Sequence, residues 1–158
     1  MNIEKHILRI AFWTSALAVM FVVFTVAAFA QNDVLQVPTV QAQMAQLYKQ
    51  AAGTYFYTSS DHTEYSFTVD ATGQPRAITS SHDSMKNYLK FFTGDLAIIH
   101  THPHGADPRP SDGDIITAKR CGVPNYELSQ SALWVAGPDG TSHKVGDVSL
   151  HHGVLEIK

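Results

Sequence analysis

The chain has 158 residues, enough for one domain, and a formal net charge of −3 at pH 7. Nucleic-acid-binding domains normally carry a basic stripe, so this acidic balance argues against DNA or RNA as a partner. The single cysteine, Cys121, excludes an intramolecular disulfide, and a core built from ~130 residues does not need one. Its place at an apolar helix end predicts a small buried residue.

The first 30 residues have the pattern of a targeting segment. Lys5 and Arg9 precede an apolar run over 10–29, and the segment ends in Ala28-Phe29-Ala30. A basic start, an apolar centre and a small-x-small end are typical of a secretory signal peptide, here cleaved after Ala30. The run is also long enough to span a bilayer, so an uncleaved anchor is the alternative, and the only membrane link we expect. Both interpretations predict export, to the periplasm or out of the cell.

The segment after Ala30 is predicted to join this leader to the folded domain. Residues 31–38 are mostly polar and end in a proline, which indicates a linker, and the domain is expected over 39–158. Apolar residues at helical spacing predict an amphipathic helix over 39–52, and Gly53 is a suitable stop.

The middle of the chain reads as short strands and turns. Strands are predicted over 55–57 and 64–69, then a turn at 70–75, a returning strand at 76–79 and a helix over 80–93.

The second half predicts a sheet with one long helix. The expected elements are a buried strand at 95–101, a helix at 111–120, strands at 126–128 and 133–135, and one or two strands within 145–157. Strands dominate, and a helix lies on either side of the central strands in the chain. This pattern predicts an α/β sandwich, a mixed β-sheet flanked by helices, in a single domain.

Two histidines at a strand end are the chain's strongest chemical signal. His100 and His102 follow the apolar stretch 96–99 and, being two residues apart, would project from the same face of a strand. Asp114, twelve residues after His102, can supply a carboxylate from beyond the next loop. Two imidazole nitrogens and one oxygen would leave a tetrahedral Zn²⁺ with one open position, as in catalytic sites. The sequence therefore predicts a zinc hydrolase.

The His-x-His-Pro run at 100–103, with Ser-x-x-Asp at 111–114, resembles the signature of the JAMM metalloproteases, also called the JAB/MPN family. The spacer 103–110 has eight residues, one more than is usual in that family, and a surface loop tolerates such an insertion. The resemblance covers about residues 50–145, and the stretch 118–140 is similar to bacterial JAB-type domains of uncharacterised function. It implies the JAMM fold, a sandwich similar to that of cytidine deaminases.

The resemblance also implies a glutamate upstream of the histidines. Glu4 lies in the targeting segment, which leaves Glu64, on a predicted strand 36 residues before His100. In the family such a glutamate takes a proton from the metal-activated water and delivers it to the leaving amine, although an exposed strand glutamate is the alternative. The resemblance further implies that Ser111 hydrogen-bonds the oxyanion, and a plain helix N-cap is its alternative.

Asp114 has a second interpretation as well. Ser111 and Asp114 have the spacing of a capping box, in which the acidic side chain bonds back to the cap residue. Asp107 and Asp112 stay open as other candidates for the third metal ligand, because the longer spacer changes the reach of Asp114.

These observations predict an exported zinc-dependent peptidase or isopeptidase-like amide hydrolase that acts on a peptide or protein. Export argues against the cytosolic ubiquitin-like substrates of eukaryotic relatives, and it leaves envelope peptides, peptidoglycan cross-links or an exported toxin. The alternative is a non-catalytic envelope binding module that keeps the fold with a structural metal or none. A zinc deaminase is disfavoured because that chemistry uses a Cys-x-x-Cys pair and the chain has one cysteine.

Overall fold

A computed structural model of the chain describes residues 34–54, 63–81, 89–102 and 106–158. The chain divides into two units, Met1–Asp33 and Val34–Lys158, and the second unit contains all of the described residues. The predicted signal segment, the strand at 55–57 and half of the predicted helix at 80–93 lie outside them. Within the described part, no helix is long and apolar enough to cross a membrane.

The second unit is built on a seven-stranded mixed sheet. Its elements in chain order are the 3₁₀ helix η1 (Val34–Gln36), α2 (Pro38–Thr54), β1 (Glu64–Val69), β2 (Thr79–Ser81), β3 (Ala97–Thr101), α3 (Asp112–Cys121), β4 (Asn125–Leu128), β5 (Ala132–Ala136), β6 (Ser142–His151) and β7 (Val154–Ile157). The strand order is β2-β1-β3-β4-β5-β6-β7, in which β3 and β4 are parallel and the other neighbouring pairs antiparallel. This confirms the predicted α/β class with a mixed sheet, while the JAMM fold stays a prediction.

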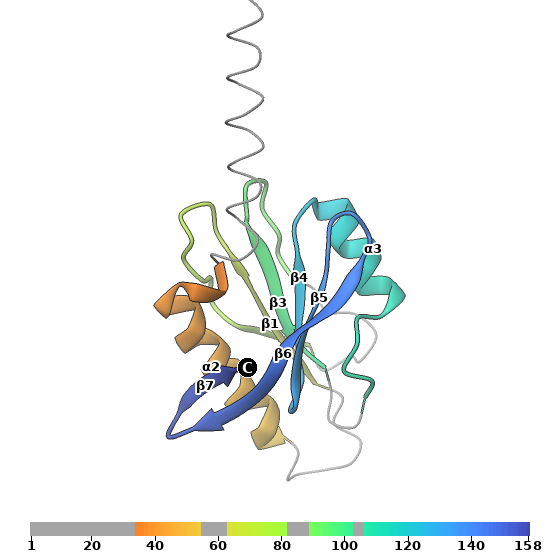
Figure 1. Cartoon of the computed structure of the whole chain (residues 1–158). Coiled ribbons are helices and arrows are strands. Elements are labelled where there is room, and N and C mark those ends of the chain that lie inside the picture. The colour runs from red at the N-terminus through yellow and green to blue at the C-terminus, as the bar shows by residue number, and fades with distance from the viewer. Residues whose placement is uncertain (1–33, 55–62, 82–88, 103–105) are drawn as a thin grey trace, which may run out of the picture. The chain divides into compact units, whose positions relative to one another are not determined.

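The two faces of the sheet differ in chemistry, because alternate residues of a strand point to opposite faces. On one face, the buried side chains of α2 pack against apolar residues of the central strands. This core includes Val40, Met44, Leu47, Phe67, Val69, Ile99, Tyr126, Leu128, Leu133 and Val135. The opposite face carries α3 and the polar residues of the same strands, and Figure 1 shows the two helices on opposite sides of the sheet.

The strand that returns after β1 begins further along the chain than the sequence predicts. A bridge joins Val69 to Pro75, and Arg76 N donates to Thr68 O at 2.9 Å, but regular pairing resumes only in β2. The predicted returning strand at 76–79 is therefore displaced toward Ser81. Proline has no N–H to donate to the ladder, which accounts for the irregular pairing where the hairpin begins. The helix predicted over 80–93 is wrong over 80–81, which belong to β2, and over 89–93, which are not helical.

The folded unit begins at Val34, five residues before the expected Thr39. Val34 and Leu35 lie in η1 and are buried in the core, and α2 starts at Pro38. The predicted linker at 31–38 is therefore not a linker from residue 34 onward. Two apolar residues, Val34 and Leu35, are too short a run to predict a buried element. Pro38 suits the first turn of α2 because the N–H that proline lacks would be unpaired there anyway.

Candidate metal site

The end of β3 presents the two histidines on the polar face of the sheet. His100 lies in the strand and is 5% exposed, and His102 follows just beyond the last strand residue and is half-buried. Their ring centroids are 5.2 Å apart. The intervening Thr101 points the other way, where its Oγ1 accepts from Tyr65 N at 3.1 Å. The alternation of the strand thus produces the paired imidazoles that the sequence predicts.

The start of α3 brings a carboxylate to the same place. Ser111 is the N-cap, and its Oγ accepts a hydrogen bond from Asp114 N at 3.3 Å. Asp114 Oδ2 in turn accepts from Ser111 N at 2.8 Å and from Ser111 Oγ. The predicted capping box is therefore present, and the helix ends, as expected, at Gly122, which has a φ of 71°.

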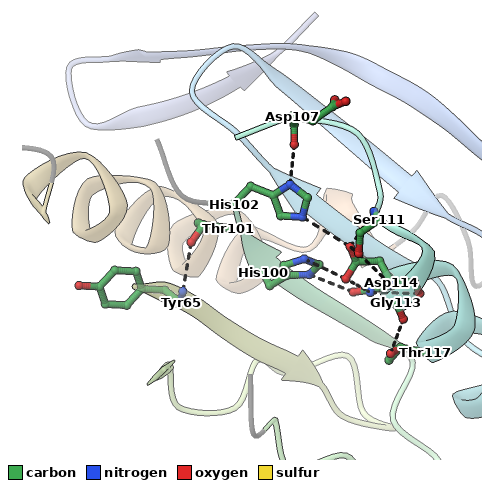
Figure 2. A network of polar contacts seen from close by, with 10 residues as sticks. Tyr65, His100, Thr101, His102, Asp107, Ser111, Gly113, Asp114 and Thr117 are labelled. Atoms are coloured by element: carbon green, nitrogen blue, oxygen red, sulfur yellow. Dashed lines mark hydrogen bonds and ion pairs between the residues drawn. The ribbon is translucent and has the colours of Figure 1, made fainter. Parts of the chain in front are cut away.

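Asp114 faces both histidines at the same time as it caps the helix. His100 Nε2 lies 3.3 Å from Asp114 Oδ1, and His102 Nε2 lies 3.5 Å from Asp114 Oδ2. Figure 2 shows both rings turned toward this carboxylate. One ligand atom from each of the three residues lies within 4.8 Å of the others, so they can hold a metal ion. Capping and ligation, which compete in the sequence, are compatible because a carboxylate has two oxygens.

Hydrogen bonds on the far side of each ring fix the two imidazoles. His100 Nδ1 lies 3.1 Å from Asn125 Oδ1, and His102 Nδ1 lies 2.7 Å from the Asp107 carbonyl oxygen. Since both partners are oxygen acceptors, each Nδ1 carries the hydrogen, and each Nε2 is the nitrogen turned toward Asp114. Histidine ligands of metals are usually held in this way, with the other ring nitrogen donating to a carbonyl or carboxylate.

The charges of the group suit a cation. Burial lowers the pKa of His100 to about 4, so its ring is neutral near pH 7. Burial also lowers the pKa of His102, but hydrogen bonds to Asp114 and to the Asp107 carbonyl outweigh it and raise the pKa to about 9. Burial raises the pKa of Asp114, yet its bonds with His102 and Ser111 hold it well below the usual range. A proton on His102 is thus the positive charge that balances the carboxylate, and a divalent cation can replace it.

Glu64 lies on the same face as the histidines. The antiparallel register pairs Ser66 of β1 with His100 of β3, so Glu64, two residues earlier, is on the side of the sheet that His100 faces. Glu64 is half-buried, and burial raises the pKa of its carboxyl to about 7, against the charge of His102, which lowers it. The charges of His102 and Asp114 both act on the pKa of this carboxyl.

The other two candidate ligands lie elsewhere. The carboxylate of Asp107 binds the guanidinium of Arg109, with Arg109 Nε 2.9 Å from Oδ1, and only its backbone carbonyl touches the site. Asp112 is exposed in the first turn of α3. Among the described residues, Asp114 is the carboxylate grouped with the two histidines.

Two further polar residues, Asn125 and Glu127, belong to this face, and neither was predicted from the sequence. The parallel register sets His100 beside Glu127 and Ile98 beside Asn125. Burial raises the pKa of Glu127 to about 9, and the charge of Asp114 adds to this effect. The alternation of polar and apolar residues over 125–128 indicates that Asn125 and Glu127 share a face of a strand. It does not indicate which strand lies next to β4, so it could not place them beside His100.

A cavity lies at the carboxyl ends of β3 and β4 on the side of α2, and His102 is the candidate ligand among its lining residues. It has a volume of about 230 Å³ and lies between the last turns of α2, the end of β3 and the turn at 129–131. Tyr48 closes one side, where its hydroxyl donates to Gln130 O at 3.0 Å. The described residues that line the cavity include no Asp, Glu, Lys or Arg. Its place at the carboxyl ends of two parallel strands is a common one for ligand sites in α/β sheets.

Comparison with known proteins adds no relative. No family model matches the chain, and no curated protein or solved structure does either. The similarity to JAMM enzymes therefore depends on the residues of the site alone.

Proposed function

We propose that this protein is an exported zinc-dependent amide hydrolase of the JAMM type, which acts on a peptide or protein. One observation carries the proposal: the Nε2 atoms of His100 and His102 both face the carboxylate of Asp114, while their Nδ1 atoms are held by oxygen acceptors. Three protein ligands of this kind are the usual number in catalytic zinc sites, where the fourth position stays open.

His100, His102 and Asp114 are the residues that would hold the ion. Zn²⁺ is favoured because imidazole suits it well and a carboxylate completes the set. When bound, it would lower the pKa of a water molecule toward neutrality and polarise the carbonyl of the substrate.

Glu64 is assigned the proton transfers. Its carboxylate would take the proton of the attacking water and later deliver it to the leaving amine. A general base works best when its pKa lies near the working pH, and burial raises the pKa of Glu64 to about 7. This environment favours the role of a base over that of an ordinary surface glutamate.

Ser111 is assigned first to holding Asp114. Its hydroxyl bonds Asp114 Oδ2 and its Oγ accepts from the Asp114 N–H, so it fixes the carboxylate in place. Stabilising the oxyanion, the role that the family resemblance implies, would require the hydroxyl to turn from Asp114 to the substrate.

The cavity beside His102 is the proposed place for part of the substrate. Apart from His102, its described lining residues are uncharged, which suits a peptide segment with neutral side chains. With the predicted export signal, this favours envelope peptides or peptide cross-links over a cytosolic protein.

The proposal is tested on the full chain, purified in a mild detergent because residues 10–29 are apolar. Wild type, His102→Ala and Glu64→Gln are loaded with zinc, measured for metal content and incubated with a peptide library read by mass spectrometry. Glu156→Gln on β7 is the matched acid-to-amide control. We expect about one zinc per chain in all except His102→Ala, and cleavage that Glu64→Gln lowers about 10²–10⁴-fold. Zinc without any cleavage would favour the binding module, and no zinc at all would refute the zinc hydrolase and leave the binding module without a metal.

A further inference from the structure

Glu127 is a buried carboxylate with no assigned role. It lies in the middle of β4 and is 0% exposed. Neither carboxylate oxygen has a hydrogen-bond partner among the residues that the structure describes. Burying a carboxylate without a partner is unfavourable by several kcal/mol as an order of magnitude, so such a residue calls for an explanation.

The sheet places Glu127 next to the metal site. Its register partner on one side is His100, and Asn125, two residues earlier on the same face, holds the ring of His100. On the other side it pairs with Trp134 of β5. The charges that act on Glu127 are those of Asp114 and His102, so its carboxylate is close enough to both to interact with them.

Among the described residues, no lysine or arginine pairs with the carboxyl groups on the polar face. Glu64, Asp114 and Glu127 converge on the polar face, and within the described part of the chain none of them pairs with a lysine or an arginine. Among the described residues, the positive group that acts on Glu64 and Glu127 and faces Asp114 is the protonated ring of His102. A divalent cation bound by the two imidazoles and Asp114 would stabilise the ionised form of carboxyl groups on the same face.

Glu127 is nevertheless outside the compact ligand group, which contains only His100, His102 and Asp114. We propose that Glu127 is an outer carboxylate of the metal site, which raises the affinity for a divalent cation through its charge and without ligating the ion. This inference builds on the proposed metal site, which it extends by a residue that the His-x-His and Ser-x-x-Asp pattern does not contain.

The test measures zinc affinity, using full-length protein in detergent and a chromophoric chelator as competitor. Glu127→Gln keeps the shape and removes the charge, and Glu156→Gln makes the same chemical change on β7. We expect Glu127→Gln to raise the Kd for zinc by about 10–100-fold, the usual effect of replacing a residue that surrounds the metal ligands without binding the ion. Glu156→Gln should leave the Kd unchanged. A Kd for Glu127→Gln within threefold of wild type would overturn the proposal.

A second readout separates an outer carboxylate from a ligand. The visible absorption of bound Co²⁺ reports its coordination, so Glu127→Gln at saturating cobalt should keep the wild-type spectrum. A changed spectrum would overturn the outer role in favour of direct ligation. Melting of the metal-free proteins in chelator checks folding, and if Glu127→Gln does not fold, Glu127→Met replaces it and is judged by the same two criteria. If wild type itself binds no zinc, the proposed function fails; if it binds and Glu127→Gln equals it, only this inference fails.

Discussion

Asn125 Oδ1 lies 3.1 Å from His100 Nδ1, in a buried contact between the adjacent parallel strands β3 and β4. The contact fixes both the orientation of the ring and its tautomer, so that Nε2 faces Asp114. Asn125 Nδ2 also lies 3.4 Å from the Asp114 carbonyl oxygen, which ties β4 to the first turn of α3. One side chain therefore links two of the three candidate ligands.

Replacing Asn125 should weaken metal binding although the residue is no ligand. Asn125→Ala removes the acceptor for His100 Nδ1, and we expect the Kd for zinc to rise by about 10–100-fold. Asn125→Asp keeps an acceptor oxygen at this position and should bind zinc nearly as well as wild type. Titration against a chelator measures both, and equal affinity of wild type and Asn125→Ala would show that the contact does not position the ring.

Zinc affinity should rise with pH between about 6 and 9. The pKa of His102 without metal is about 9, because its bonds to Asp114 and to the Asp107 carbonyl outweigh burial, so its ring holds a proton at neutral pH. Ligation through Nε2 must displace that proton, and affinity should increase by about tenfold per pH unit until the pH passes the pKa. Calorimetry in two buffers of different ionisation enthalpy should show at least one proton released per zinc at pH 7. A binding enthalpy that does not depend on the buffer would contradict this prediction.

Ser111→Ala should affect both the helix and the site. The loss of the N-cap should lower the free energy of unfolding by about 1 kcal/mol. The loss of the hydroxyl also frees Asp114 Oδ2 from one of its two bonds to Ser111, so zinc affinity should fall as well. Ser111→Thr keeps the hydroxyl and serves as the control. Urea unfolding of the metal-free protein and zinc titration give the two values, and a variant that changes neither would refute the capping role.

Leu35→Ala should be clearly destabilising, because Leu35 is buried in the core beneath α2. We expect a loss of roughly 2–5 kcal/mol in the free energy of unfolding, the usual range for a buried leucine. Gln36→Ala, at the exposed neighbouring residue, should change it by less than about 0.5 kcal/mol. Urea denaturation compares the two. Equal stability would restore the interpretation of this segment as a linker.

Local patterns predicted the parts of the site that depend on one element. The two-residue spacing of His100 and His102 puts both on one face of any strand, and the Ser-x-x-Asp spacing from Ser111 makes a capping box in any helix that starts there. Both predictions are confirmed. The alternation over 64–69 likewise predicted β1 and separated Glu64 from the apolar side chains of its strand.

The roles of Asn125 and Glu127 required the tertiary structure. Each lies in a strand that the sequence predicts, but the strand's neighbour is set by the parallel pairing of β3 with β4, across the helix α3 that connects them. The same holds for Val34 and Leu35, whose burial depends on where α2 lies on the sheet.

The sequence by itself determined the alternating faces, the capping of α3 and the order of ligand-type residues, since these follow from backbone geometry over a few residues. Only the tertiary structure decided which carboxylate meets the histidines, which oxygens orient their rings, and that an unpartnered glutamate lies beside them. Those contacts join residues distant in the chain, and they form because the apolar face of the sheet packs against α2 and leaves the polar face to α3.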